Sequence, residues 1–178
     1  MGIGAKLPFR AVIVRRARVE DVGAAARVAA AVAEEDFLGL QPPVDPEERA
    51  QRYRELIDQE AMWVLEAEGQ IVGYAAAPER TPGVLSVGMA IKAPARGQGG
   101  GRALLAAIQQ HARTTGAHKI SLEVWTDNVR AIALYASAGF EVEGLRRGHY
   151  RRRDGRLRST LIMAWRVTDG QGRSGADG

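Results

Sequence analysis

The sequence contains no cysteine, and this absence excludes several kinds of chemistry at once. Disulfide bonds, thiolate metal sites and a cysteine nucleophile are impossible, and an intracellular location is favoured. Histidine is scarce as well. His111, His118 and His149 are scattered without the spacing of metal ligands, so we expect no metal site and no catalytic histidine.

Long apolar runs are also missing. No segment reaches the roughly 20 apolar residues that a membrane helix needs. The first ten residues lack the apolar stretch of a secretion signal. We therefore expect a soluble, cytoplasmic protein that has no membrane partner.

The chain of 178 residues, 46% of them hydrophobic, is long enough for one domain with one core. We assign residues 11–167 to this domain, and residues 1–10 and 168–178 to flexible ends, because the tail is rich in Gly, Ser and Asp. Apolar periodicity and turn residues predict the following elements: a strand at 11–15, a helix at 22–35 capped by Asp21, a loop at 38–46, a helix at 47–59, a hairpin of strands 61–68 and 71–77, a strand at 84–91, a helix at 101–115, a strand at 119–125, a short helix capped by Asp127 or Asn128 and ending at 138, and a last hairpin from 140 to 167.

A glycine-rich run at residues 96–102 (RGQGGGR) lies between the apolar strand 84–91 and the helix that follows. Glycine has no Cβ, so its backbone N–H can approach an anion closely, and the helix start adds the positive end of its dipole. No Ser, Thr, Asp or Asn lies just ahead of Ala103 to cap the first N–H groups of the helix. The run predicts a phosphate-binding loop, and the alternative is a flexible strand-to-helix turn.

Two better-known phosphate loops do not match these residues. A Walker loop ends in Gly-Lys-Ser/Thr, whereas Arg102 and Ala103 follow the last glycine here. A dinucleotide fingerprint needs a small residue three places after its second glycine, where this chain has Arg102 or Leu104. The first mismatch excludes a P-loop NTPase, and the second makes a dinucleotide site a poor fit.

Positive charge is concentrated late in the chain, whose net charge is +4. Arginine recurs between residues 146 and 158 and is opposed there only by Asp154. We expect a solvated hairpin, with an anionic partner as the alternative. We do not expect nucleic acid as a partner, because Tyr150 stands almost alone as an aromatic residue in this segment.

Two motifs follow one another in the chain, Arg96-x-x-Gly99-x-Gly101 and Asn128-x-x-Ala131-x-x-Leu134-Tyr135-x-x-x-Gly139-Phe140. In order and spacing they resemble the motifs of the GCN5-related N-acetyltransferase (GNAT) family. The likeness extends from residue 14 to Met163, and the stretch from residue 122 to Phe140 is most similar to the branch of the family that acetylates protein N-termini. It implies an α/β (α+β) fold with a mixed, mostly antiparallel central sheet flanked by helices.

The resemblance also implies acetyl-CoA as co-substrate, bound where two strands of the sheet splay apart. Gly88 would mark a bulge that opens this gap. The residues that the resemblance places beside the coenzyme are Met89, Ala90 and Ile91 at the pantetheine, Gly97, Gln98, Gly99 and Gly101 at the pyrophosphate with Arg96 and Arg102 adding charge, and Asn128, Ala131 and Tyr135 on the next helix. Gly100 stands where the family usually has Ile, Leu or Val, which predicts a loop with one packing anchor fewer.

Glu123 and Tyr135 are the candidate catalytic residues. An amine must lose a proton before it attacks a thioester, and the departing thiolate leaves more easily if a group donates a proton to it. In the similar branch of the family the matching Glu acts as base and the matching Tyr as acid. The alternatives are a Glu123 that merely pairs with a nearby arginine, or acts through water, and a Tyr135 that merely packs in the core.

We therefore expect an acetyl-CoA-dependent N-acetyltransferase that acts on a primary amine, either a protein N-terminus or a small molecule. A non-catalytic acyl-CoA-binding regulator is the main alternative, and an RNA- or ribosome-associated protein that uses its arginine-rich hairpin is a third. The acceptor stays open, because no residue in the segment 36–46 or in the last hairpin identifies it. A homodimer is possible, although no interface is evident in the sequence.

Overall fold

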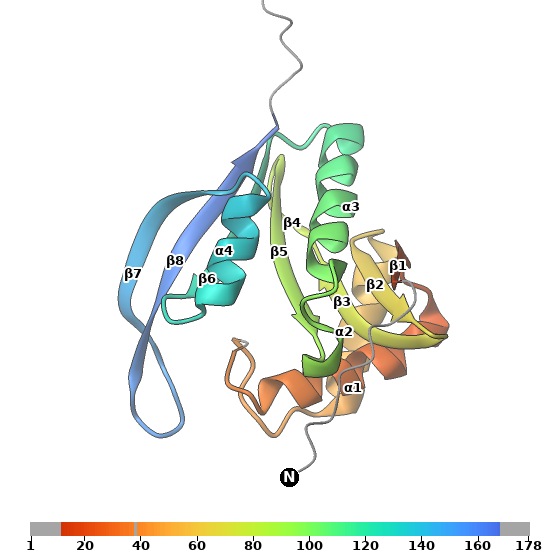
Figure 1. Cartoon of the computed structure of the whole chain (residues 1–178), viewed down its shortest axis with the longest axis horizontal. Helices are drawn as coiled ribbons and strands as arrows, with labels where there is room; N and C mark the ends of the chain where they lie inside the picture. Colours follow the sequence, from red (N-terminus) through yellow and green to blue (C-terminus); the bar gives the residue numbers. More distant parts are fainter. Residues whose placement is uncertain (1–11, 38, 168–178) are drawn as a thin grey trace, which may run out of the picture.

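The computed structural model describes residues 12–37 and 39–167, so the two ends predicted to be flexible lie outside the described residues. Strands and helices follow the predicted order, apart from one short strand at Glu79–Thr81 and two 3-10 helices that were not predicted (Figure 1). The elements are β1 (Val12–Arg16), the 3-10 helix η1 (Val19–Asp21), α1 (Val22–Ala33), α2 (Pro46–Asp58), β2 (Met62–Ala67), β3 (Gln70–Ala76), β4 (Glu79–Thr81), β5 (Val84–Ile91), the 3-10 helix η2 (Ala93–Ala95), α3 (Gly100–Thr115), β6 (Lys119–Trp125), α4 (Val129–Ser137), β7 (Glu141–Arg151) and β8 (Leu157–Arg166). No helix in the described part of the chain is long and apolar enough to cross a membrane.

The strands form one mixed sheet in the order β1-β2-β3-β5-β6-β8-β7, and β4 pairs with β5 beside this path. Every neighbouring pair is antiparallel except β5 and β6, which are parallel. A parallel pair needs a crossover, and α3 supplies it. The predicted mixed, mostly antiparallel sheet flanked by helices is confirmed.

Helices cover both faces of the sheet, because the strands alternate apolar side chains between the two faces. On one face α3 and α4 pack against the sheet in a cluster that includes Leu65 of β2, Leu104 of α3 and Ile120 of β6, all fully buried. On the other face α1 and α2 cover a second cluster that includes Val64 and Tyr74. Alternate residues of β2 thus enter different clusters, and the expected single core is divided in two by the sheet.

The described structure corrects the sequence interpretation at several helix and strand ends. Asp21 lies just before α1, but its carboxylate makes no capping bond to that helix. It accepts instead from the Arg18 amide at 2.8 Å and from the Arg15 guanidinium at 2.6 and 2.9 Å. Pro46 opens α2 rather than ending the loop before it, because proline lacks the N–H that a first helical position does not use.

The central strands separate halfway along, and this separation makes room for a ligand. β5 pairs with β6 from Val84 to Val87 only, opposite Lys119 to Leu122. From Gly88 to Ile91 it pairs with β3 alone, while β6 continues along β8. Gly88 marks the point of separation, but its pairing with β3 is regular, so the predicted bulge is wrong. The edge of β5 that faces β6 is left without a strand partner beyond Val87.

Candidate active site

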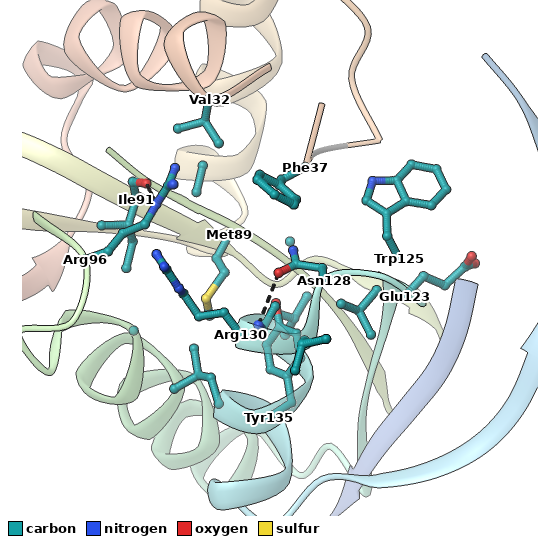
Figure 2. Close-up of a pocket in the computed structure, with 18 of the residues that line it drawn as sticks. Val32, Phe37, Met89, Ile91, Arg96, Glu123, Trp125, Asn128, Arg130 and Tyr135 are labelled. Atoms are coloured by element: carbon teal, nitrogen blue, oxygen red, sulfur yellow. Dashed lines mark hydrogen bonds between the residues drawn. The ribbon is translucent and has the colours of Figure 1, made fainter. Parts of the chain in front are cut away.

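A cleft of about 1190 Å³ occupies the gap between the second halves of β5 and β6 (Figure 2). This volume exceeds the ~300–1,000 Å³ typical of small-ligand sites, which suits a long ligand together with a second substrate. Its walls come from β5, the glycine-rich loop, β6 and α4, with Val32 and Phe37 on the α1 side. The predicted residues that line it are Met89, Ala90, Ile91, Arg96, Gly97, Gly99, Gly101, Arg102, Glu123, Asn128, Ala131 and Tyr135.

The glycine-rich loop enters α3 in the geometry of an anion site. Gly97 and Gly99 have φ angles of 73° and 84°, a left-handed conformation that side chains other than glycine rarely adopt. Gly99 is the N-cap of α3 and offers no side-chain cap. Among the described residues, no acceptor is found for the amide groups of Gly97, Gly99 or Gly101. These donors point to a phosphate or another anion at the helix start.

The guanidinium group of Arg96 is occupied by hydrogen bonds within the protein. Its Nη1 and Nη2 donate to the two carboxylate oxygens of Glu35 at 2.5 and 2.9 Å, and its Nε donates to the Ile91 carbonyl at 2.7 Å. A bidentate pair of this kind fixes the end of α1 to the end of β5. Arg96 therefore shapes the cleft wall, and its predicted role as a phosphate cation stays a prediction. Gln98 does not line the cleft, and its side chain donates to the Pro94 carbonyl at 2.9 Å.

Gly100 is buried at the start of α3, and an added Cβ would lie 2.4 Å from a methyl carbon of Leu65. The Leu65 side chain fills the space that an apolar side chain at residue 100 would take. The packing anchor that the loop was expected to lack is therefore present, and it comes from β2. At Gly101, too, a neighbouring side chain takes the space of a Cβ, because an added Cβ would lie 2.8 Å from the Leu134 side chain on α4.

Asn128 is the N-cap of α4. Its side-chain oxygen accepts from the Ala131 amide at 3.2 Å, the bond drawn in Figure 2. The predicted short helix thus starts as the sequence indicates, with Asn128 rather than Asp127 as the cap. This cap fixes the turn that brings Tyr135 to the cleft two helical turns later.

Arg130 was missed by the sequence interpretation. It lines the cleft from the first turn of α4, and Figure 2 shows its side chain extending into the cleft. No ion-pair partner for it is found in the described part of the chain. An arginine in the first turn of a helix is electrostatically unfavourable, because the helix dipole is positive there. This unfavourable placement within the second motif is a signal that could have identified it.

Tyr135 projects from α4 into the cleft, and its residue is 7% exposed. Its ring lies 5.8 Å from that of Phe140, and no described residue makes a hydrogen bond with its hydroxyl. Burial raises the pKa of the Tyr135 phenol to about 12. The phenol is therefore protonated at neutral pH and has a proton to donate.

Glu123 lies in the cleft on the opposite face of the sheet from Tyr135, since its neighbours Leu122 and Val124 point to the α3 face and Glu123 points away from it. One carboxylate oxygen pairs with Arg146 at 2.8 Å. The other accepts from the hydroxyls of Tyr150 at 2.8 Å and Thr160 at 2.9 Å. A carboxylate has about four acceptor positions, so one position, on the oxygen that faces Arg146, is still available.

The arginine-rich hairpin closes one end of the cleft. The Arg152 guanidinium donates to the Asp36 carboxylate, and Arg158 donates to the Asp36 carbonyl at 2.6 Å and to Asp127 at 2.6 Å. Both guanidinium groups also stack on the Trp125 ring, at 5.3 and 4.4 Å from its centre. These contacts connect β7 and β8 to the segment after α1. Part of the hairpin's charge is thus used inside the protein rather than left for an anionic partner.

Comparison with known proteins agrees with this geometry. The model of the Acetyltransferase (GNAT) family matches residues 29–140. The N-alpha-acetyltransferase RimI of Mycobacterium tuberculosis is 42% identical over 89 residues, which are 47% of this chain and 53% of that protein. The chain thus spans about half the length of this curated relative.

Solved structures share the whole fold. A ribosomal-protein-alanine N-acetyltransferase from Brucella melitensis has a TM-score of 0.79 and 28% identity, over 87% of this chain and 99% of that one. A phosphinothricin acetyltransferase of the GNAT superfamily from Sinorhizobium meliloti, solved in complex with acetyl-CoA, has a TM-score of 0.77 and 22% identity, over 94% of each chain. With the matching family model, the separated central strands and the uncapped glycine loop, the chain belongs to the Acetyltransferase (GNAT) family.

Proposed function

We propose that this protein transfers the acetyl group of acetyl-CoA to the primary amine of a protein N-terminus. The observation that carries the proposal is that Tyr135 and Glu123 line the same cleft from opposite faces of the sheet, Tyr135 from α4 and Glu123 from β6. The relatives named for acetylating protein N-termini or ribosomal-protein alanine support the choice of acceptor. A small-molecule amine is the alternative acceptor.

Glu123 is positioned to receive a proton from the acceptor. It faces the side of the sheet opposite α3, and its available acceptor position can hold the ammonium group or a bridging water. Arg146, Tyr150 and Thr160 fix the direction of the carboxylate. An amine that has lost its proton here can form the new C–N bond with the thioester carbonyl.

Tyr135 is positioned to donate a proton to the leaving group. As the C–S bond breaks, the sulfur takes the phenolic proton. When the amide forms, the nitrogen releases its second N–H proton. This proton replaces the one that Tyr135 has given, so the phenol is restored. The products are the acetylated amine and the free thiol of CoA.

The glycine-rich loop and two nearby cations fit the phosphates of the coenzyme. The amide groups of Gly97, Gly99 and Gly101 would receive the pyrophosphate at the start of α3. Arg102 and Arg130 line the same cleft, and Arg102 has one weak contact, with Ser137 at 3.4 Å. The backbone of Met89 to Ile91, which has no strand partner on the β6 side among the described residues, suits the amides of the pantetheine arm, although the Ile91 carbonyl already accepts from Arg96.

Replacing Arg130 by glutamine should raise the KM for acetyl-CoA by about 10-fold and leave kcat unchanged, as expected for the loss of one charge-assisted phosphate contact. Steady-state kinetics over a range of salt concentrations would measure this effect, which should shrink at high salt. Arg27→Gln, on the exposed side of α1, is the matched control. An unchanged KM for acetyl-CoA in Arg130→Gln would remove Arg130 from the phosphate site.

The activity itself is tested by CoA release from acetyl-CoA with a mixed panel of peptides and small amines. We expect release with peptides that have a free N-terminus, and none with the same peptides after N-terminal blocking. Release with small amines only would move the acceptor to the small-molecule class. Binding of acetyl-CoA without release for any acceptor would favour the non-catalytic acyl-CoA-binding regulator.

A further inference from the structure

We propose that a basic hollow beside the active-site cleft binds a carboxylate of the acceptor, so that the enzyme prefers acidic acceptors. This inference deepens the proposed function and rests on it. The hollow has a volume of about 370 Å³ and lies on the α2 side of the sheet. Its polar lining includes Arg49, Arg52, Tyr53 and Arg80, and no Asp or Glu of the described residues lines it.

The hollow contains buried polar atoms that have no hydrogen-bond partner among the described residues. Tyr53 is 2% exposed, its ring lies 5.0 Å from that of Tyr74, and its buried hydroxyl makes no hydrogen bond of normal geometry within the described residues. The Nε of Arg49 is also buried without a partner, and its guanidinium lies 5.9 Å from the centre of the Tyr53 ring. Leaving such groups unsatisfied is unfavourable, and a bound oxygen anion would accept from both.

The arginines of the hollow are largely available to a ligand. Arg52 pairs with Glu55 at 2.5 Å. In the part of the chain that the structure describes, Arg49 and Arg80 have no ion-pair partner. A guanidinium presents two parallel N–H donors that match the two oxygens of a carboxylate. The chemistry of the hollow therefore selects an anion, and a carboxylate is the anion that peptides and amino acids carry.

The hollow and the cleft adjoin across β5. Gly39, Val87, Gly88 and Met89 line both. Gly88 is exposed, and an added Cβ would have no atom within 4 Å, so the space above it is open. An acceptor whose amine reaches the gap between β5 and β6 can therefore extend over Gly88 into the hollow. Its carboxylate would come from an acidic residue near the N-terminus of a peptide, or from a free acidic amino acid.

The test compares acceptors that differ only in charge. Peptides with Asp at position two or three are compared with the same peptides carrying Asn, and free aspartate is compared with free asparagine. We expect kcat/KM to be about 10-fold higher for the acidic member of at least one pair, through KM, as expected for a charge-assisted hydrogen bond. The pair that shows the preference identifies the source of the carboxylate.

Two variants localise the preference to the hollow. Arg80→Gln, at an exposed side chain, should reduce the preference for the acidic acceptor about 5-fold, with the change expressed in KM. Tyr53→Phe should also reduce it and change the free energy of unfolding by less than about 1 kcal/mol, because the lost hydroxyl has no hydrogen bond of normal geometry among the described residues. Arg54→Gln, on the exposed side of α2 and outside the hollow, is the control and should change nothing.

Calorimetric titration of the same peptides into the protein with bound CoA measures their affinities, so that the preference for acidic acceptors can be tested even without turnover. Equal affinity and equal kcat/KM for the acidic and neutral members of every pair would overturn the inference while the proposed acetyl transfer stands. Failure to release CoA with any acceptor would overturn the proposed function. The binding preference would then decide alone whether the hollow recognises a carboxylate.

Discussion

Replacing Tyr135 by phenylalanine should lower kcat by about 10- to 1000-fold and leave the affinity for acetyl-CoA nearly unchanged. The phenol is buried beside the gap between β5 and β6, and its hydroxyl has no partner among the described residues. Its removal therefore takes away a proton donor without breaking a structural contact. Single-turnover kinetics with acetyl-CoA prebound would measure the transfer step, and calorimetry the affinity.

The pH dependence of the rate adds a second measurement. Burial raises the pKa of Tyr135 to about 12, so the phenol keeps its proton throughout the usual assay range. A general acid loses activity only as the pH rises through its pKa, so Tyr135 should cause no decline in kcat between neutral pH and about pH 10.

A packing control separates the hydroxyl from the ring. Phe140→Leu loosens the contact between the two rings, whose centres are 5.8 Å apart, but keeps the phenol. It should change kcat by less than about 3-fold, well below the range expected for loss of a general acid. Turnover that is unchanged in Tyr135→Phe would remove Tyr135 from the mechanism and leave the protonation of the thiolate to solvent.

Local features of the site were predictable from the sequence because their causes are local. The glycines of residues 96–102 have no Cβ, and no capping side chain precedes α3, so an open helix start follows from the sequence order itself. Asn128 is a preferred N-cap residue, and the spacing to Tyr135 places the phenol on the face of α4 that meets the cleft. In both cases the residues that form the feature are close together in the chain, and its geometry depends on few contacts with distant residues.

The contacts that decide what each charged residue does were not predictable in the same way. Arg96 pairs with Glu35, 61 positions earlier, and Arg152 with Asp36, 116 positions earlier. Apolar periodicity and turn signals report on neighbours in the chain, and they say nothing about which of many arginines meets which acid. For the same reason the hollow at Arg49, Tyr53 and Arg80 is visible only when α2 and β4 are placed against β5.

The strand β4 was missed because its three residues are all exposed and show no apolar alternation. The predicted bulge at Gly88 was wrong for a related reason. A glycine inside a strand indicates that a side chain is disfavoured there. It does not indicate whether a bulge, a bend or the approach of a ligand is the reason. At Gly88 no described atom would contact an added Cβ, which would lie in the open space between the cleft and the hollow, and the pairing of the strand is regular.

Replacing Gly100 by valine should lower the free energy of unfolding by about 2 kcal/mol, even though valine resembles the residues that the family usually has at this position. An added Cβ would lie 2.4 Å from Leu65 Cδ2 and 3.1 Å from Leu65 Cδ1. Leu65 is fully buried, so its side chain has little space to move away. Chemical denaturation of Gly100→Val and of the unmodified protein would measure the difference.

Gly23→Ala is the matched control for a glycine that is removed from a helix. Gly23 is exposed on α1, and a Cβ there would make only an ordinary contact, 3.6 Å from Arg27. Because alanine has the higher helix propensity, this change should raise the free energy of unfolding by about 0.5–1 kcal/mol. Opposite signs at the two positions would show that crowding against Leu65, and not the loss of glycine as such, destabilises the Gly100 variant.

A double-mutant cycle tests the contact directly. Leu65→Ala alone should cost about 2–5 kcal/mol, because it leaves a cavity in the core. In Leu65→Ala/Gly100→Val the valine enters that cavity, so the double variant should be more stable than the sum of the two single changes predicts, by about 1 kcal/mol or more. Additive losses would mean that Leu65 does not occupy the space above Gly100. In that case the backbone of the glycine-rich loop, and not packing against Leu65, would require the glycine. The affinity for acetyl-CoA should then fall in Gly100→Val whichever residue stands at position 65.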